Sequence, residues 1–286
     1  MKNNWFIGLG LLLPSLLRAD IIEAKSVEEM QPHVEEGTLV LFGMTDTLTD
    51  STLSLGSKPW RQYIRRQLRP IQDINEAGNL HDQWTYYVAT QVPLKPVQDE
   101  FIGWIDQMQQ NNIPVFCLTG RGRDVWYESI VQEVDQLTEY QLKKININFE
   151  KTKVPEDLQK ADTKYFYHGI FYSDPYSKGE LIDKILNETG YKPKKVIVVD
   201  DKWDQLQSIQ QKMTEADIPF VGILYQRAEK ERKDFKPIIS ILQLESLFEN
   251  GFPLSEAEAA EKAEKMENPS ADELFKKLVQ KYGNLN

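Results

Sequence analysis

Cysteine and histidine are scarce in this sequence. Its 286 residues include one cysteine, Cys117, which excludes an intrachain disulfide and a zinc site built from several cysteines. The three histidines, His33, His81 and His168, lack the spacing of metal ligands, so a histidine-built metal centre is disfavoured. Glycine (15) and proline (14) are too few for a collagen-like chain or for Pro/Gly-rich disorder. The 41% of hydrophobic residues suffice instead for a proper core, in one large domain or two small ones.

Positive charge is also in short supply. The chain has 34 Lys and Arg against 44 Asp and Glu, a net charge of −10. A surface of this sign repels phosphate backbones, so we expect no nucleic-acid partner. The most basic stretch, residues 61–69, carries Arg61, Arg65, Arg66 and Arg69 at helical spacing. These arginines form either a solvated helix face or a surface that recognises an anionic substrate or partner.

Long apolar runs are missing except at the N-terminus. Residues 5–17 hold no charged side chain, Lys2 precedes them, and Arg18, Ala19 and Asp20 follow. A basic start, an apolar core and a small exit residue predict a signal peptide over residues 1–19, cleaved after Ala19. The run is shorter than the ~20 residues that a membrane span needs. We therefore expect an exported bacterial protein, periplasmic or secreted, with no membrane span after cleavage; an uncleaved anchoring or buried helix is the alternative.

Five short apolar runs are predicted to be buried strands: residues 38–42, 113–118, 168–172, 195–199 and 219–225. They are β-branched or aromatic and nearly continuous, which is typical of parallel strands covered on both faces. Helical patterns separate them, at residues 97–110, 124–137, 179–189 and 202–213. This alternation predicts an α/β fold, a three-layer Rossmann-like parallel sheet.

Two stretches depart from the alternation. Residues 48–93 contain a set of large aromatics (Trp60, Tyr63, Trp84, Tyr86 and Tyr87) and are predicted to form a small helical cap inserted over the strand ends. These aromatics form either the cap's own core or the lining of a ligand pocket. Residues 251–286 are predicted to be a C-terminal helical tail, exposed or loose over its Ala/Glu/Lys-rich part. The core domain is then expected to comprise residues 20–47 and 94–250.

Polar residues follow four of the predicted strands, and in open α/β sheets reactive groups collect just beyond the carboxyl ends of strands. The four stations are Gly43-Met44-Thr45-Asp46-Thr47, Thr119-Gly120, Lys178-Gly179 and Asp200-Asp201. The hydroxyl and the lysine would hold phosphate oxygens, and the paired carboxylates would hold Mg²⁺, which prefers oxygen ligands. Taken alone, a threonine after a strand is usually a turn or cap residue and a lysine that opens a helix is usually solvated, while the aspartate pair is more diagnostic but is also compatible with helix capping. The order and spacing of all four favour phosphate chemistry.

These stations resemble those of the haloacid dehalogenase-like (HAD-like) superfamily, whose members are mostly Mg-dependent phosphatases. The resemblance spans residues 35–225, and the segments LGSKPW (55–60), HGIFYSD (168–174) and VVDDKWDQLQS (198–208) are similar to an uncharacterised exported bacterial branch of it. The resemblance implies that Thr119, with Gly120, binds phosphate and that Lys178 stabilises it. It also implies that Asp200 and Asp201 form a weak Mg²⁺ site.

The first station departs from the superfamily pattern Asp-x-Asp-x-Thr. The register set by Thr47 places Gly43 at the nucleophile and Thr45 at the acid–base aspartate. Glycine has no reactive side chain, and a threonine hydroxyl titrates too high to shuttle protons near neutral pH; losing acid–base help alone costs about 10²–10⁴-fold in rate. The comparison therefore implies no intact catalytic residue and a Mg²⁺ site that is weak or absent. Asp46 is expected to point away from the phosphate, and Asp50 to lie too far into the cap linker to substitute.

Other chemically notable residues carry weaker expectations. Arg121 and Arg123 follow the Thr119 station and either contact an anionic ligand or face the cap and solvent. His168 falls inside a predicted strand and is expected to be packed there. Cys117 is expected to be buried and inert.

Three functional hypotheses follow. The first is an exported phosphatase-like pseudoenzyme that binds a small phosphorylated ligand or a protein partner without turnover. The second is a working Mg-dependent phosphatase or phosphotransferase with a rearranged mechanism. The third is a structural or host-interaction module that docks through residues 255–286.

Overall fold

The computed structural model of the chain describes residues 19–70, 74–123 and 134–283. The predicted signal peptide lies outside the described residues except for Ala19, and so does most of the helix expected at residues 124–137.

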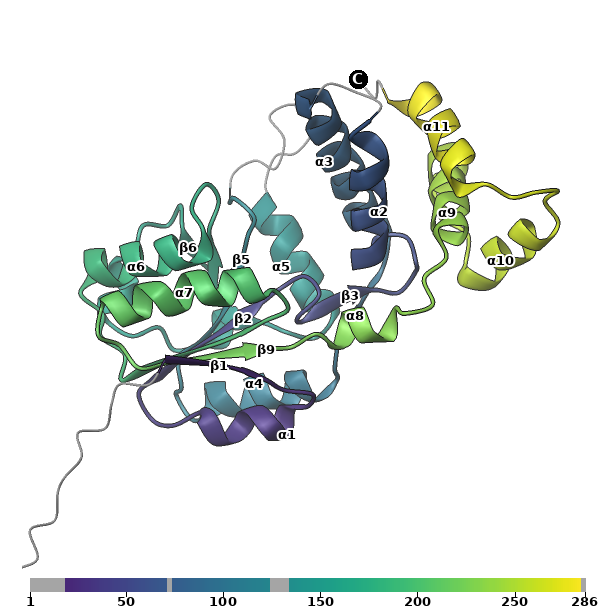
Figure 1. The fold of residues 1–286 in the computed structure, drawn as a ribbon. Coiled ribbons are helices and arrows are strands. Elements are labelled where there is room, and N and C mark those ends of the chain that lie inside the picture. The colour runs from purple at the N-terminus through teal and green to yellow at the C-terminus, as the bar shows by residue number, and fades with distance from the viewer. Residues whose placement is uncertain (1–18, 71–73, 124–133, 284–286) are drawn as a thin grey trace, which may run out of the picture.

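A seven-stranded sheet forms the centre of the molecule, in the order β1-β9-β8-β2-β5-β7-β6 (Figure 1). Every neighbouring pair is parallel except the short β6–β7 hairpin. The predicted α/β fold with a parallel three-layer sheet is thus confirmed, with β1 and β6 added to the five expected strands. The strands are β1 (Ala19–Glu23), β2 (Thr38–Gly43), β5 (Val115–Thr119), β6 (Phe166–Tyr167), β7 (Ile170–Tyr172), β8 (Lys195–Asp200) and β9 (Phe220–Leu224).

Both faces of the sheet are covered, which explains why the strands are continuously apolar. Along β2, Val40 and Phe42 face one hydrophobic core, and Leu39 and Leu41 face the other. Helices α1 (Val27–Met30) and α4 (Glu100–Gln110) supply side chains to the first core, whereas α6 (Lys178–Thr189) and α7 (Trp203–Glu215) cover the second. Packing on both sides holds the strand ends at fixed positions, as a binding site requires.

Local signals set where the elements next to the strand ends begin. Helix α6 starts with a capping box in which the Ser177 hydroxyl accepts from the backbone N–H of Glu180 and the Glu180 carboxylate accepts from that of Ser177. Lys178 therefore occupies the first helical position, close to the sheet.

The remaining short elements are α5 (Val134–Lys144), α8 (Arg227–Glu231) and the 3₁₀ turns Gln31–His33, Phe149–Lys151 and Asp157–Lys160.

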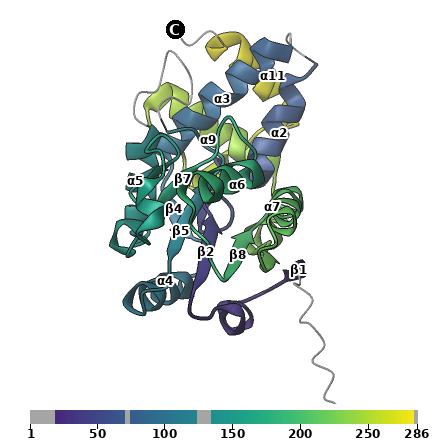
Figure 2. The same ribbon diagram turned by 90° about the vertical axis from the view of Figure 1, so that its left-hand side faces the viewer.

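A second group of helices lies beyond one end of the sheet (Figures 1 and 2). An antiparallel pair of short strands, β3 (Thr49–Ser51) and β4 (Leu94–Pro96), leads into and out of residues 52–93. The helices of the group are α2 (Lys58–Leu68), α3 (Ile74–Gln91), α9 (Pro237–Asn250), α10 (Glu256–Glu264) and α11 (Ala271–Tyr282).

The aromatic residues of the insertion do not form a core by themselves. Trp60 and Trp84 pack in one cluster with Leu244 of α9 and Phe275 of α11. The Trp84 and Phe275 rings lie 5.7 Å apart in an edge-on contact. The apolar face of α11 therefore completes the core of α2 and α3. The exposed or loose stretch was expected over residues 255–268, where α10 is mostly exposed and buries Ala259.

His168 is placed differently from the prediction. The strand expected over residues 168–172 begins only at Ile170, and His168 lies in the β6–β7 turn with a φ of 48°. Its side chain is exposed, and its Nδ1 lies 2.8 Å from Glu139 Oε1. The strong β pattern of the neighbouring residues concealed a two-strand hairpin with its turn at this point. Cys117, in contrast, is fully buried in β5 as expected, and burial raises the pKa of its thiol to about 12.

Candidate functional site

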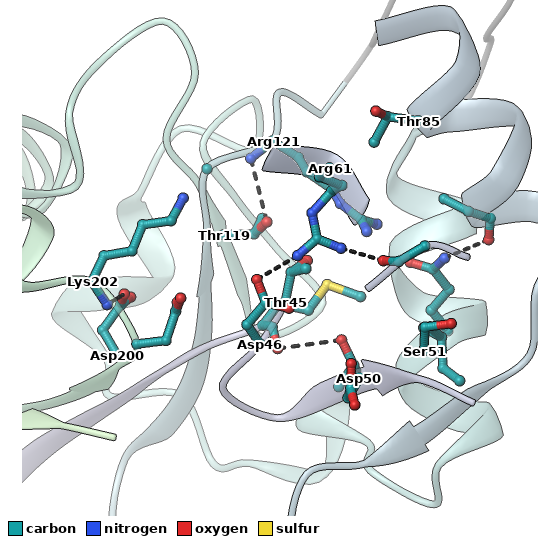
Figure 3. Close-up of a pocket in the computed structure, with 18 of the residues that line it drawn as sticks. Thr45, Asp46, Asp50, Ser51, Arg61, Thr85, Thr119, Arg121, Asp200 and Lys202 are labelled. Carbon is teal, nitrogen blue, oxygen red and sulfur yellow. Dashed lines mark hydrogen bonds and ion pairs between the residues drawn. The ribbon is translucent and has the colours of Figure 1, made fainter. Parts of the chain in front are cut away.

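A cavity of about 450 Å³ opens at the carboxyl ends of β2, β5 and β8, between the sheet and helices α2, α3 and α5. Its volume falls in the usual range of small-molecule sites, about 300–1,000 Å³. The stations predicted from the sequence meet here: Thr45, Thr119, Gly120, Lys178, Asp200 and Asp201 all line it. Figure 3 shows Thr119 and Arg121 in the middle of this cavity, with Asp200 and Lys202 on one side.

Gly43 ends β2, and its missing side chain is essential to the arrangement. A Cβ atom at this position would lie 2.7 Å from Asp200 Oδ2 and 2.8 Å from Thr47 Oγ1. The Asp200 carboxylate, only 1% exposed, is held there by Lys178 Nζ at 2.5 Å from Oδ2 and by the backbone N–H of Lys202 at 3.0 Å from Oδ1. The space in which a side chain at position 43 would start is therefore occupied by a buried ion pair.

Asp201 is also buried and paired. Its Oδ2 lies 3.1 Å from Lys58 Nζ on α2, so this ion pair links the sheet to the inserted helices. Burial, reinforced by the nearby Asp200 and Asp46 carboxylates, raises the pKa of Asp201 to about 6, and the Lys58 ammonium opposes that rise. The backbone N–H of Asp201 donates to Thr47 Oγ1 at 3.1 Å, which ties the first and fourth stations together.

Asp46 contradicts its prediction. Instead of pointing away, its carboxylate lines the cavity, is 4% exposed, and forms an ion pair with Arg61 of α2. The reason is its backbone: a φ of 66° reverses the chain, and its N–H donates to the carbonyl of Thr49. Asp50 also lines the cavity, paired with Arg232 Nη2 at 3.0 Å, and burial raises the pKa of its carboxyl.

Arg121 places a half-buried positive charge beside the Thr119 hydroxyl. Its backbone N–H donates to Thr119 Oγ1 at 3.3 Å, and its Nη1 donates to Thr138 Oγ1 on α5 at 3.0 Å. Burial lowers the pKa of the Arg121 guanidinium to about 10, so the group remains protonated at neutral pH. Arg123, in contrast, lies over the Tyr167 ring, 3.8 Å from its centroid, and pairs with Asp135 outside the cavity lining.

The donor set can be compared with what Mg²⁺ requires. The ion takes several oxygen ligands in near-octahedral geometry, usually including one or two carboxylates. Here Asp200 is paired with Lys178 and Asp201 with Lys58, while Gly43 supplies no carboxylate. Among the described residues, the one group of three acidic or histidine ligand atoms close enough for a metal is Glu139, Glu150 and His168, outside this cavity. The cavity residues as arranged therefore do not fit a Mg²⁺ ion.

The far wall of the cavity was not anticipated from the sequence. His81 and Thr85 of α3 and Gln141 of α5 line it together with Trp60. The i, i+4 spacing of His81 and Thr85 places both on one face of a helix, and this was the available signal. Nothing in the local sequence indicated that α5 would bring Gln141 to the same wall.

A family model described as "Protein of unknown function (DUF2608)" matches residues 23–259. The chain belongs to this family. Among its relatives, a Chlamydia trachomatis protein named "Putative outer membrane protein" is 23% identical over 83% of this chain and 90% of its own length. An uncharacterised protein of Rickettsia bellii is 21% identical over 92% of this chain and 98% of its own length. No solved structure matches.

The description of the DUF2608 family assigns no activity, so the resemblance to HAD-like phosphatases remains a prediction. Within the described part of this DUF2608 chain, no helix is both long and apolar enough to cross a membrane.

Proposed function

We propose that this protein binds a small phosphorylated ligand in the cavity at the strand ends and does not turn it over. The observation that carries the proposal is the position of Gly43. The resemblance assigns a nucleophile there, but Asp200 Oδ2 lies 2.7 Å from where even a Cβ would be, and Lys178 holds that carboxylate in place. A nucleophile at this point would have to displace a buried ion pair.

The charge of the cavity supports an anionic ligand. Its lining contains five aspartates (46, 50, 82, 200 and 201) and five basic residues (Arg61, Arg65, Arg121, Lys178 and Lys202), within a chain of net charge −10. Asp46, Asp200 and Asp201 each have a cationic partner. Arg65 and Lys202 have no acidic partner among the described residues, so their charges remain for a ligand.

The groups around Thr119 suit phosphate oxygens. The Thr119 hydroxyl accepts from the Arg121 N–H, which leaves its own hydrogen to donate. The Lys178 ammonium carries three hydrogens, of which one serves Asp200. Arg121 keeps its charge because its pKa, though lowered, stays near 10, and Thr138 fixes its orientation. Charge-assisted hydrogen bonds of this kind are the strong ones in anion recognition.

The test combines calorimetry with a turnover assay. We expect inorganic phosphate to bind, and Arg65→Gln to weaken binding about three- to tenfold, since the lost charge is partly solvated. Arg66→Gln is the matched control, because Arg66 neighbours Arg65 on α2 but does not line the cavity. We expect no hydrolysis of an aryl phosphate with Mg²⁺. Hydrolysis that Asp200→Asn abolishes would show an enzyme instead.

A second candidate function, a rearranged phosphatase, is favoured by the position of Asp46. Its buried carboxylate faces the cavity, so the site does contain a carboxylate near the missing nucleophile. The Arg61 ion pair counts against this role because it engages the group. Aryl phosphate hydrolysis by the wild type that disappears in Asp46→Asn would establish this alternative.

We further propose that the protein is exported in bacteria. The N-terminal pattern of residues 1–19 supports this, as do two chlamydial relatives whose names begin "Putative outer membrane protein". Cleavage after Ala19 would leave residues 20–23 of β1, paired with β9, as the start of the mature fold. Mass spectrometry of the exported protein should find Asp20 at its N-terminus; an N-terminus at Met1 would contradict cleavage.

A further inference from the structure

Residues on the far wall of the cavity carry several unsatisfied polar atoms. In the described part of the chain, six buried side-chain nitrogen or oxygen atoms have no hydrogen-bond partner. Four of them belong to residues that line the cavity: Trp60 Nε1, His81 Nε2, Thr85 Oγ1 and Gln141 Oε1. Buried polar groups normally find partners, so a cluster on one cavity wall points to a ligand that supplies them.

The contacts of these side chains show whether each unpartnered atom is a hydrogen-bond donor or an acceptor. Gln141 Nε2 donates to the carbonyl of Ala89 at 2.8 Å, which fixes the amide and leaves Oε1 as an acceptor. His81 Nδ1 lies 3.0 Å from a carboxylate oxygen of Asp82, so Nδ1 carries the hydrogen. The Nε2 atom is then the position that faces no partner, and a hydroxyl can pair with it as donor or as acceptor. Trp60 Nε1 can only donate, and the Thr85 hydroxyl does both.

One chemical group satisfies this mixture. An alcohol donates one hydrogen bond and accepts others, so hydroxyls can serve the indole, the imidazole and the amide oxygen alike. An alkyl or aryl group would serve none of them. A second anionic group has no hydrogen to offer the Gln141 Oε1 acceptor and is disfavoured on this wall.

The wall lies apart from the phosphate-binding groups. Figure 3 shows Thr85 on the inserted helices, across the cavity from Asp200 and Lys202. Trp60 is fully buried, His81 and Gln141 are 7% and 4% exposed, and Thr85 is half-buried, so these residues form a built wall. A ligand with an anionic end and a polar end can therefore contact both sides at once.

We propose that the ligand is an organic phosphate carrying several hydroxyl groups, and that Trp60, His81, Thr85 and Gln141 bind those hydroxyls. This proposal rests on the proposed function for the phosphate end and adds the chemical class of the rest of the molecule. Each restored hydrogen bond is expected to raise affinity about 2- to 12-fold.

Calorimetry with three probes separates the two proposals: inorganic phosphate, propyl phosphate and glycerol 3-phosphate. The two esters share a carbon skeleton and differ in their hydroxyls. We expect glycerol 3-phosphate to bind at least about fivefold more tightly than propyl phosphate. Thr85→Val, which is close to isosteric, should reduce that preference about 2- to 12-fold and leave the affinity for propyl phosphate unchanged.

Trp60→Phe provides a second test with a matched control. It removes the unpartnered indole N–H of a residue that lines the cavity, whereas Trp84→Phe removes an equally unpartnered N–H from a residue that does not line the cavity. Only Trp60→Phe should reduce the preference for glycerol 3-phosphate. Thermal melts check that both variants are folded, and Thr85→Val carries the test if Trp60→Phe is not.

The outcomes distinguish the proposals. Equal binding of the two esters, with phosphate bound, overturns the hydroxyl-binding wall and leaves phosphate binding intact. A preference for glycerol 3-phosphate that survives both Thr85→Val and Trp60→Phe also overturns the assignment of these residues. If none of the three probes binds, the proposed function and this inference both fail.

Discussion

Substitution of Gly43 tests whether the space beside this position can still accommodate a side chain. Gly43→Ala adds one carbon at 2.7 Å from Asp200 Oδ2 and 2.8 Å from Thr47 Oγ1, both well inside normal contact distances. Relieving that overlap requires the buried Lys178–Asp200 pair to shift. Overpacking of this kind costs about 1–3 kcal/mol in the free energy of unfolding. For a chain of this size, the melting temperature should fall by about 2–12 °C.

Gly43→Asp should be worse, because it adds a third carboxylate beside Asp200 and Asp201. At a separation of about 5 Å and an effective dielectric constant near 20, one such repulsion costs about 3 kcal/mol. The sign can be checked with pH. The added carboxyl would have a folded-state pKa above its unfolded value of about 3.9, so its penalty is absent below that pH and grows toward neutrality. The stability gap between Gly43→Asp and Gly43→Ala should therefore narrow by the electrostatic part as the pH falls from 7 to 4.

Chemical denaturation at pH 4 and pH 7 measures both quantities. Gly120→Ala is the control, because a Cβ at this other cavity-lining glycine meets nothing within 4 Å. A change below about 0.5 kcal/mol is expected there, as for ordinary sites without a clash. If Gly43→Ala were as stable as Gly120→Ala, or if Gly43→Asp hydrolysed an aryl phosphate, the reasoning about an occupied nucleophile position would be refuted.

Three further predictions concern the ion pairs and the helical layer. Lys58→Met removes the ammonium that opposes the rise of the Asp201 pKa, which is about 6 with Lys58 present, so the buried carboxyl becomes still harder to ionise. The variant should lose up to about 3–5 kcal/mol of stability at pH 7. Most of this loss should be regained at pH 5, where Asp201 is largely protonated in both proteins, and unfolding curves with no such recovery would contradict the pairing. Phe275→Ala should cost about 3–5 kcal/mol, whereas Phe252→Ala, at a residue that is 64% exposed, should cost little; equal losses in thermal melts would count against the shared core. Millimolar Mg²⁺ should leave the melting temperature of the wild type unchanged, since Asp200 and Asp201 are already neutralised; a clear rise would show a cation site.

The sequence predicted the sheet well because its signal is local. Continuous apolar runs predict buried parallel strands, and the residues after such strands must meet at one edge, so the convergence of Thr119, Lys178 and Asp200 followed from topology alone. Asp46 was mispredicted because its direction depends on a positive φ that the residue type tolerates but does not announce. The partners Lys58 and Arg61 were equally out of reach, since they come from an inserted helix whose docking is a tertiary event.

The surroundings of position 43 could not be predicted from the resemblance. The sequence alone shows that position 43 has no side chain, but not whether the space is empty or filled. The Asp200 carboxylate fills this space. Its position depends on the side-chain rotamer of Asp200 and on the ion pair with Lys178, which lies 22 positions earlier in the chain. The polar wall of the cavity could not be predicted from the sequence either. Whether a buried polar atom has a hydrogen-bond partner depends on which side chains tertiary structure places around it.

The shared core of the inserted and C-terminal helices has a consequence for the order of folding. Tyr63 of α2 donates to Asp272 of α11 across 209 positions of chain, and Phe275 completes the cluster around Trp84. Such distant contacts form late, because a long loop must close before they stabilise anything. A chain emerging N-terminus first would present Trp60 and Trp84 uncovered until its last helix arrived. A molecule truncated before α11 would therefore keep part of this aromatic cluster exposed, and exposed apolar surface of that kind makes a chain prone to aggregate.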